Sequence, residues 1–329
     1  MRRVGLQAAI FFVPFALFAS FIALTDPFDL LGTPSVVSEA TRMKVAAELN
    51  PTLWKMGKFL ATDDDRVLLG DSRLGHIDVR EIERVSGRKY FNFWYGGGTL
   101  REMLNTFWFA THHRKLKEVV MNVAFSTYND NNVTDRSGAY EEFHKAPALY
   151  FFDWTVFEAA YYGVSADWFR QPFVLGVPRV TRNQFWNLEL DFARNRYRTH
   201  AMPGKYKADM QEMARYCRTH GIVLTFIILP GHIDLQNEVG RCGLSSEYLQ
   251  FKSDMAHMAV TYDCDYPNSF TAERRNFIDP FHFTTSAGNV LIEDLWGGDL
   301  RYCRILHAGE QGTLLSSGLT DGDQASRKG

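Results

Sequence analysis

The chain has 329 residues, 46% of them hydrophobic, and a formal net charge of −2 at pH 7 with histidine neutral. This length and this hydrophobic content are enough for one large folded domain or two ordinary ones. The nearly balanced charge argues against a general nucleic-acid-binding protein, which would carry an excess of Lys and Arg.

Residues 1–25 predict a membrane anchor. Two arginines precede an uncharged stretch from Leu6 to Leu24, and a helix of that length spans about 28 Å, close to the thickness of the bilayer core. The segment lacks a good small-x-small cleavage site, so we expect it to be retained. The next basic residue after Arg3 is Arg42, and the positive-inside rule then places the body outside the cytoplasm. We expect a single-pass protein of a bacterial inner membrane with a periplasmic or other extracytoplasmic domain.

Residues 26–62 are interpreted as a linker with one helix, and an alternation of strands and helices follows it. Apolar runs predict the strands, and stretches with helical periodicity predict the helices. Strands that alternate with helices favour a mostly parallel sheet covered on both faces. The expected strands are 66–72, 89–95, 118–126 and 222–231, and the expected helices are 38–51, 73–87, 99–116, 205–221, 245–260 and 284–298.

Residues 131–204 interrupt this alternation, with ten aromatic residues between Tyr150 and Phe173. We expect a largely helical insertion, which is either a subdomain with its own small core or a cap over the carboxyl edge of the sheet. In a cap, the aromatic residues would line a sugar or acyl groove or rest against the membrane. A run of arginines follows, which is either a solvated face or an attraction for an anionic polymer. These arginines are Arg179, Arg182, Arg194, Arg196 and Arg198.

The last part of the α/β domain, which we expect over 63–306, contains all four cysteines of the chain. In an oxidising compartment they allow three full pairings, among which the sequence does not choose, and Cys242 with Cys264 is only a guess. No cysteine pair has metal-site spacing, and we expect no metal or other cofactor. Residues 307–329 are rich in Gly, Ser, Asp and Lys, which predicts a disordered tail.

Polar residues suited to serine catalysis lie at the ends of the expected strands, where parallel α/β sheets bind their ligands. A serine hydrolase needs a hydroxyl, an imidazole, a carboxylate that orients it, and donors for the oxyanion. Taken singly, each residue also has a structural interpretation, such as a helix N-cap for the serine or a turn for the asparagine. The residues are Ser72 in "LLGDSR", Gly96–Gly98 in "YGGG", Asn129 in "STYND", and Asp279 and His282 in "IDPFHF".

These four blocks, in this order, resemble the SGNH, or GDSL-type, hydrolase superfamily, and in particular its membrane-anchored members linked to polysaccharide or cell-wall acylation. The resemblance implies a flavodoxin-like three-layer α/β/α fold. It also implies that Ser72 is the nucleophile, His282 the general base and Asp279 its partner. The implied oxyanion donors are the Ser72 backbone N–H, a glycine N–H near Gly97, and the Asn129 side chain.

The chain departs from the family pattern at three places. "GDSR" stands where Gly-Asp-Ser-Leu is usual, Thr127 occupies the position of a glycine in the third block, and the second block offers three glycines. Arg73 and His232 are candidate substrate contacts. We interpret His76, together with His112 and His113, as surface residues.

The resemblance implies acyl transfer through a serine ester. Water would resolve this ester in an esterase, and a sugar hydroxyl would resolve it in an O-acetyltransferase. The implied partners are a carbohydrate polymer, an acyl donor and a multi-spanning membrane acyl carrier. The alternative is a non-catalytic protein of the same fold that binds polymer or assembles an export complex. An enzyme requires Ser72 within hydrogen-bond reach of His282, and Asp279 within reach of the other ring nitrogen.

Overall fold

The computed structural model describes residues 2–171, 173 and 180–308. The internal contacts divide the chain into two compact units. Unit 1 contains the described residues of 1–63 and 135–179, and unit 2 contains those of 64–134 and 180–329. The expected insertion over 131–204 therefore contributes to both units.

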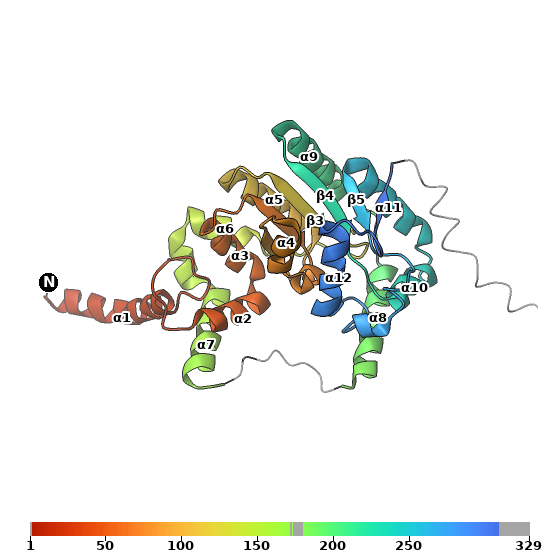
Figure 1. The fold of residues 1–329 in the computed structure, drawn as a ribbon. Helices are drawn as coiled ribbons and strands as arrows, with labels where there is room; N and C mark the ends of the chain where they lie inside the picture. The colour runs from red at the N-terminus through yellow and green to blue at the C-terminus, as the bar shows by residue number, and fades with distance from the viewer. Residues whose placement is uncertain (1, 172, 174–179, 309–329) are drawn as a thin grey trace, which may run out of the picture. The chain divides into compact units, whose positions relative to one another are not determined.

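Unit 2 is built on one six-stranded sheet with the strand order β2-β1-β3-β4-β5-β6 (Figure 1). The first five strands pair in parallel, and β6 is antiparallel to β5. The order 2-1-3-4-5 is that of flavodoxin-like sheets, here extended by an antiparallel edge strand. The strands are β1 (Arg66–Gly70), β2 (Phe91–Trp94), β3 (Glu118–Asn122), β4 (Val223–Ile228), β5 (Val260–Asp263) and β6 (Arg304–Leu306).

Helices cover both faces of this sheet, which is why β3 is buried along its whole length. On one face, α5 (Leu100–His113), α9 (Lys205–His220) and α11 (Ser245–Met258) contact β1, β4 and β5 respectively. On the other face, α4 (Val79–Ser86) and α12 (Thr285–Trp296) contact each other and share one apolar core with alternate residues of the strands. Helices α8 (Arg182–Arg198) and α10 (Ile233–Arg241) pack together. The expected three-layer arrangement is present.

The strands and most helices expected in unit 2 form near their expected positions, with two kinds of difference. The helix expected over 73–87 is divided into a 3₁₀ helix, η1 (Ser72–His76), and α4, because Asp78 accepts the Arg80 backbone N–H and begins a new helix. The short elements β5, β6, α10 and η3 (Arg274–Asn276) were not expected. β5 begins at Val260, which the sequence pattern assigns to the end of the preceding helix, and β6 and η3 have only three residues each.

Unit 1 contains α1 (Arg2–Thr25), α2 (Glu39–Leu49), α3 (Pro51–Leu60), α6 (Gly138–Lys145), η2 (Pro147–Phe152) and α7 (Trp154–Trp168). The single helix expected in the linker is two helices, because Pro51 has no N–H to continue α2 and Asn50 caps both. Tyr150 is buried, and its hydroxyl donates to the Asp26 carboxylate at 2.9 Å. Two tryptophans of the insertion, Trp154 and Trp168, are exposed.

The predicted transmembrane anchor over residues 1–25 is not supported. Within the described part of the chain, no helix is both long enough and apolar enough to cross a membrane. The last turns of α1 instead pack inside unit 1, where Ile22 is fully buried and the Phe18 ring stacks on Phe157 at 5.3 Å. The tail expected over 307–329 lies, apart from its first two residues, outside the described residues.

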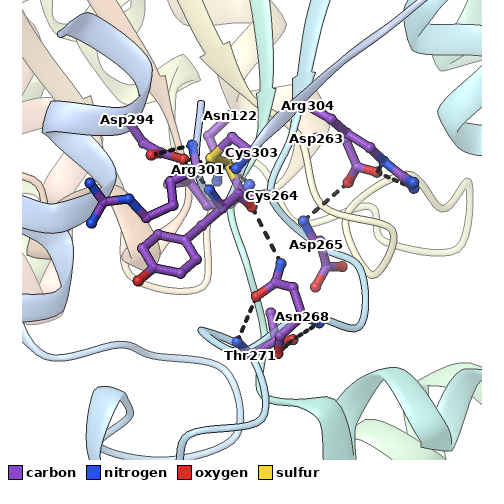
Figure 2. Close-up of a disulfide and its surroundings, with 12 residues drawn as sticks. Asn122, Asp263, Cys264, Asp265, Asn268, Thr271, Asp294, Arg301, Cys303 and Arg304 are labelled. Atoms are coloured by element: carbon purple, nitrogen blue, oxygen red, sulfur yellow. Dashed lines mark hydrogen bonds and ion pairs between the residues drawn. A yellow bond between two sulfur atoms is a disulfide. The ribbon is translucent and has the colours of Figure 1, made fainter. Parts of the chain in front are cut away.

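The disulfide joins Cys264 and Cys303, so the guess of Cys242 with Cys264 is wrong. Cys264 follows β5 and Cys303 precedes β6, and the antiparallel pairing of these strands brings the two sulfurs together (Figure 2). The Asp294 carboxylate accepts three consecutive backbone N–H groups, those of residues 301–303, and so fixes this segment. Cys217 and Cys242 are free thiols.

Candidate active site

Ser72 is the first residue of η1, immediately beyond the carboxyl end of β1. The Asp71 carboxylate caps η1 by accepting the Arg73 backbone N–H at 3.0 Å. Gly70 permits this sharp turn, because a Cβ there would lie only 2.6 Å from a Leu74 methyl carbon and 2.9 Å from the Asn122 Cβ. The half-buried serine is thus both part of a helix start and located at the carboxyl edge of the sheet, where parallel α/β sheets bind their ligands.

Ser72, His282 and Asp279 form a continuous chain of hydrogen bonds. The Ser72 Oγ lies 2.6 Å from the His282 Nε2, and the His282 Nδ1 lies 2.8 Å and 3.0 Å from the two Asp279 carboxylate oxygens. A carboxylate can only accept, so Nδ1 carries the proton in a neutral ring and Nε2 can accept the serine proton. This is the geometry that the sequence analysis required of an enzyme.

Asp279 is held in place by the turn that it begins. Its Oδ1 also accepts the backbone N–H groups of Phe281 at 2.8 Å and of His282 at 3.0 Å. Burial raises the pKa of Asp279, but the hydrogen bond and charge of His282, together with these N–H donors, outweigh burial and hold that pKa below its ordinary value. The carboxyl group is therefore ionised at neutral pH and can orient the imidazole.

Two further titratable residues lie at the triad. The centre of the His76 ring lies 5.7 Å from the centre of the His282 ring. Burial and the charge of His282 lower the pKa of His76, and they outweigh the charge of Asp279, which raises it. Glu189 on α8 faces the triad, and burial together with the charge of Asp279 raises the pKa of Glu189. His76 was interpreted as a surface residue, although its position four residues after Ser72, within one short helix, was a usable signal.

Asn129 is oriented by its backbone surroundings. Its side-chain oxygen accepts the N–H groups of Asn131 and Ala201, each at 3.0 Å, so the amide nitrogen is the end that remains to donate to an oxyanion. Thr127, the departure from the family pattern, closes the same loop by donating to the Ala124 carbonyl and accepting the Ala124 N–H. The threonine is thus accommodated without a glycine conformation.

The three glycines of the second block form a tight turn. Gly98 N–H donates to the Tyr95 carbonyl at 3.0 Å, and Gly97 has a φ of +61°, the left-handed conformation that favours glycine. Because the Gly98 N–H is already used, Gly97 is the better candidate for an oxyanion donor. The oxyanion roles of Gly97 and Asn129 stay predictions.

Arg73 lies beneath the nucleophile instead of at its surface. Its guanidinium group is buried, bonds both oxygens of Asp71, and donates to the Leu229 carbonyl at 3.3 Å. Burial raises the pKa of Asp71, but the charge and hydrogen bonds of Arg73 outweigh it and lower that pKa. The Asn122 amide bonds Asp71 as well, at 3.0 Å. The candidate substrate contact Arg73 is therefore a buried residue that fixes the start of η1.

His232 is likewise buried. It caps α10 by accepting the Asp234 N–H at its Nδ1, and its ring packs edge-on against Trp186 and Phe277. Its backbone N–H donates to the Pro280 carbonyl at 2.9 Å. Since Pro280 follows Asp279 directly, this hydrogen bond links His232 to the turn that carries the acid, and its role as a substrate contact stays a prediction.

Helix α8 belongs to the expected helical insertion, but no residue of its side that faces the Asp279–His282 segment was among the candidate site residues. Its Trp186 lies under the Arg274 guanidinium, and its Phe192 ring lies 6.4 Å from that of Phe281. Trp186, Glu189 and Phe192 are spaced by three residues and so follow one side of the helix. This side lies along the segment that carries Asp279 and His282, whose charges act on the pKa of Glu189.

Comparison with known proteins gave the following results. The chain matches no family description and no curated protein. Among solved structures, it is similar to a protein of Bacteroides fragilis provisionally described as an acylhydrolase, with 13% identity and a TM-score of 0.37 over 74% of this chain and 95% of the other. It is also similar to a protein of Streptococcus pneumoniae provisionally described as a platelet activating factor, with 10% identity and a TM-score of 0.38 over 78% and 98%.

Proposed function

We propose that this protein is a serine-dependent enzyme that cleaves or transfers ester-linked acyl groups. The observation that carries the proposal is the unbroken chain of hydrogen bonds from the Ser72 hydroxyl through His282 to Asp279, located at the carboxyl edge of the sheet. A nucleophile, a base and an orienting carboxylate in this arrangement are the requirements for acyl transfer by serine.

The reaction begins when His282 Nε2 takes the proton of Ser72 while Oγ attacks the ester carbonyl carbon. The oxyanion is stabilised by the N–H groups at the start of η1 and by the candidate donors Asn129 and Gly97. His282 then gives its proton to the leaving alcohol, which leaves an acyl ester on Ser72. In the second half, His282 removes a proton from water or from an acceptor hydroxyl, which attacks the ester and frees the serine.

We further propose O-acetyl groups on a carbohydrate polymer as the substrate class, on the strength of the motif resemblance. An extracytoplasmic location is supported by the Cys264–Cys303 disulfide, because such bonds persist in oxidising compartments. A sugar hydroxyl as acceptor would make the protein an O-acetyltransferase, and water would make it an esterase.

The test is labelling and turnover by the purified protein. Wild-type protein should react with a fluorophosphonate probe and release p-nitrophenol from p-nitrophenyl acetate, and Ser72→Ala should do neither. Ser86→Ala is the matched control and should keep both activities, because the Ser86 hydroxyl lies at the end of α4, where it donates to the Ile82 carbonyl and accepts the Arg88 N–H. Labelling that persists in Ser72→Ala would place the nucleophile elsewhere, and a wild-type protein that never reacts would favour a binding role.

A second assay separates hydrolysis from transfer. The same activated ester is supplied with and without a neutral oligosaccharide, and the products are followed by mass spectrometry. An acetylated oligosaccharide identifies a transferase, whereas free acetate alone, at an unchanged rate, identifies an esterase.

A further inference from the structure

A cavity of about 510 Å³ lies between α9 and α11, helices that pack side by side on one face of the sheet (Figure 1). None of its lining residues belongs to the triad. The volume falls in the range of small-ligand sites in proteins. It is therefore a candidate binding site that the proposed reaction does not use.

The lining of this cavity is unusually cationic. Lys207, Gln211, Arg215 and Arg218 all come from α9 and are separated by three or four residues, so they follow one side of that helix for about 16 Å. The opposite wall, formed by α11, contributes one carboxylate, Asp254. Three cations thus face one anion.

That single carboxylate already has three hydrogen-bond partners. Asp254 is buried and accepts from the Tyr128 hydroxyl at 2.9 Å, the Lys207 ammonium at 2.7 Å and the Gln250 amide at 2.8 Å. Lys207 and Asp254 therefore neutralise each other. What remains along the groove is the charge of two arginines.

The two remaining cations of the groove are Arg215 and Arg218. Arg218 donates to the Met258 carbonyl at 3.3 Å, which holds its guanidinium group at the end of α11. Within the described residues, no carboxylate lies within ion-pair distance of Arg215 or Arg218. Residues three apart on a helix are neighbours, and a guanidinium group offers paired N–H donors that match the oxygens of phosphate and carboxylate.

We propose that the α9–α11 groove is a binding site for a ligand that carries at least two neighbouring phosphate or carboxylate groups. The two arginines bind the anionic groups, and the Gln211 amide supplies a neutral donor one turn away. A phosphorylated compound and an acidic sugar chain share this chemistry. The site goes beyond the proposed catalytic function, since it uses none of the catalytic residues.

The experiment is titration calorimetry of the full chain with pyrophosphate and, separately, with a trigalacturonate. At least one probe should bind the wild type, and Arg215→Gln/Arg218→Gln should weaken that binding by about tenfold. The matched control, Arg80→Gln/Arg301→Gln, removes the same charge from exposed positions elsewhere in unit 2 and should change the affinity by less than about twofold. Circular dichroism of each variant establishes that it is folded.

The outcomes are decisive in both directions. Binding of pyrophosphate alone identifies phosphate as the source of the anion, and binding of trigalacturonate alone identifies a uronic acid chain. Absence of binding for both probes at millimolar concentration, or an equal loss in the control variant, overturns the proposal. Ser72→Ala should bind as the wild type does, so failure of the catalytic proposal would leave this result unaffected.

Discussion

At the scale of single residues, the carboxylate that orients His282 illustrates how one side chain can serve both structure and chemistry. Asp279 accepts two backbone N–H groups of its own turn and at the same time bonds the imidazole. An asparagine at this position could still accept the backbone N–H groups with its side-chain oxygen. It would, however, favour the wrong tautomer of the histidine. The two roles can therefore be separated by experiment.

Asp279→Asn should lower kcat by roughly a hundred- to ten-thousandfold, because the base loses its orienting charge, while KM changes little. Steady-state hydrolysis of p-nitrophenyl acetate measures both constants. Urea unfolding of the same variant checks that the turn survives. A variant with the wild-type kcat would show that Asp279 serves the turn alone.

Glu189 offers a prediction about stability and pH. Its raised pKa means that folding disfavours the ionised form of the Glu189 carboxyl group. The resulting loss of folding stability is present at neutral pH and vanishes as the pH falls below the pKa of the unfolded chain, about 4.3. Glu189→Gln should therefore increase the free energy of unfolding at pH 7, by at most about 1 kcal/mol because the side chain is only half-buried. Urea titrations at pH 7 and pH 4 measure this change in the free energy of unfolding. An equal gain in stability at both pH values would show that the ionised carboxyl group is not the cause.

At the scale of elements, the start of α5 connects helix stability to the candidate oxyanion site. Thr99 and Glu102 form a reciprocal capping box, with the Thr99 N–H donating to the Glu102 carboxylate and the Glu102 N–H donating to the Thr99 hydroxyl. Thr99 is buried, and its hydroxyl also donates to the Thr134 carbonyl. Since Gly96–Gly98 immediately precede it, the cap also fixes where that turn ends.

Thr99→Ala should lower the free energy of unfolding by about 2 kcal/mol, because it removes the cap and leaves the N–H of the buried Glu102 without its partner. The α8 capping box at Thr181 and Gln184 is exposed and provides the matched control, Thr181→Ala, with an expected loss of at most about 1 kcal/mol. Urea unfolding measures both. Equal losses would show that burial adds nothing to the Thr99 cap.

At the scale of the whole molecule, the Cys264–Cys303 disulfide ties the edge strand β6 to the rest of unit 2. The two cysteines are 39 residues apart in the sequence, and the intervening chain includes Asp279, His282 and α12. A cross-link over such a loop lowers the entropy of the unfolded chain. This effect stabilises the folded state by about 4 kcal/mol at most. The bond therefore stabilises the segment that carries two members of the triad.

Cys264→Ser/Cys303→Ser should lower the free energy of unfolding by roughly 2–4 kcal/mol. Thiol titration of the denatured wild type should detect only the free thiols of Cys217 and Cys242. Cys242→Ser, which touches no disulfide, is the control and should leave the stability nearly unchanged. Detection of four thiols in the oxidised wild type would contradict the pairing.

Most of the sheet could be predicted from the sequence, because four of its strands lie within apolar runs. Such a run can be recognised from neighbouring residues alone. The same is true of α9, which begins at Lys205 and ends before Gly221, as a left-handed glycine C-cap requires. By contrast, β6 has only three residues, and its antiparallel pairing with β5 depends on segments far apart in the chain. The anchor predicted over residues 1–25 rests on a count of uncharged residues alone, and within the described residues no helix is long and apolar enough to cross a membrane.

What the sequence determined by itself is the chemistry available at the strand ends: a hydroxyl after β1, an amide after β3 and an Asp-x-x-His block before α12. Local periodicity and residue type carry that information. Only the tertiary structure decided which side chains meet. It brought Ser72 to His282 across 210 residues, buried Arg73 and His232, and placed Glu189 and His76 at the triad. The physical reason is that distances and burial arise from packing between remote segments, which no local pattern records.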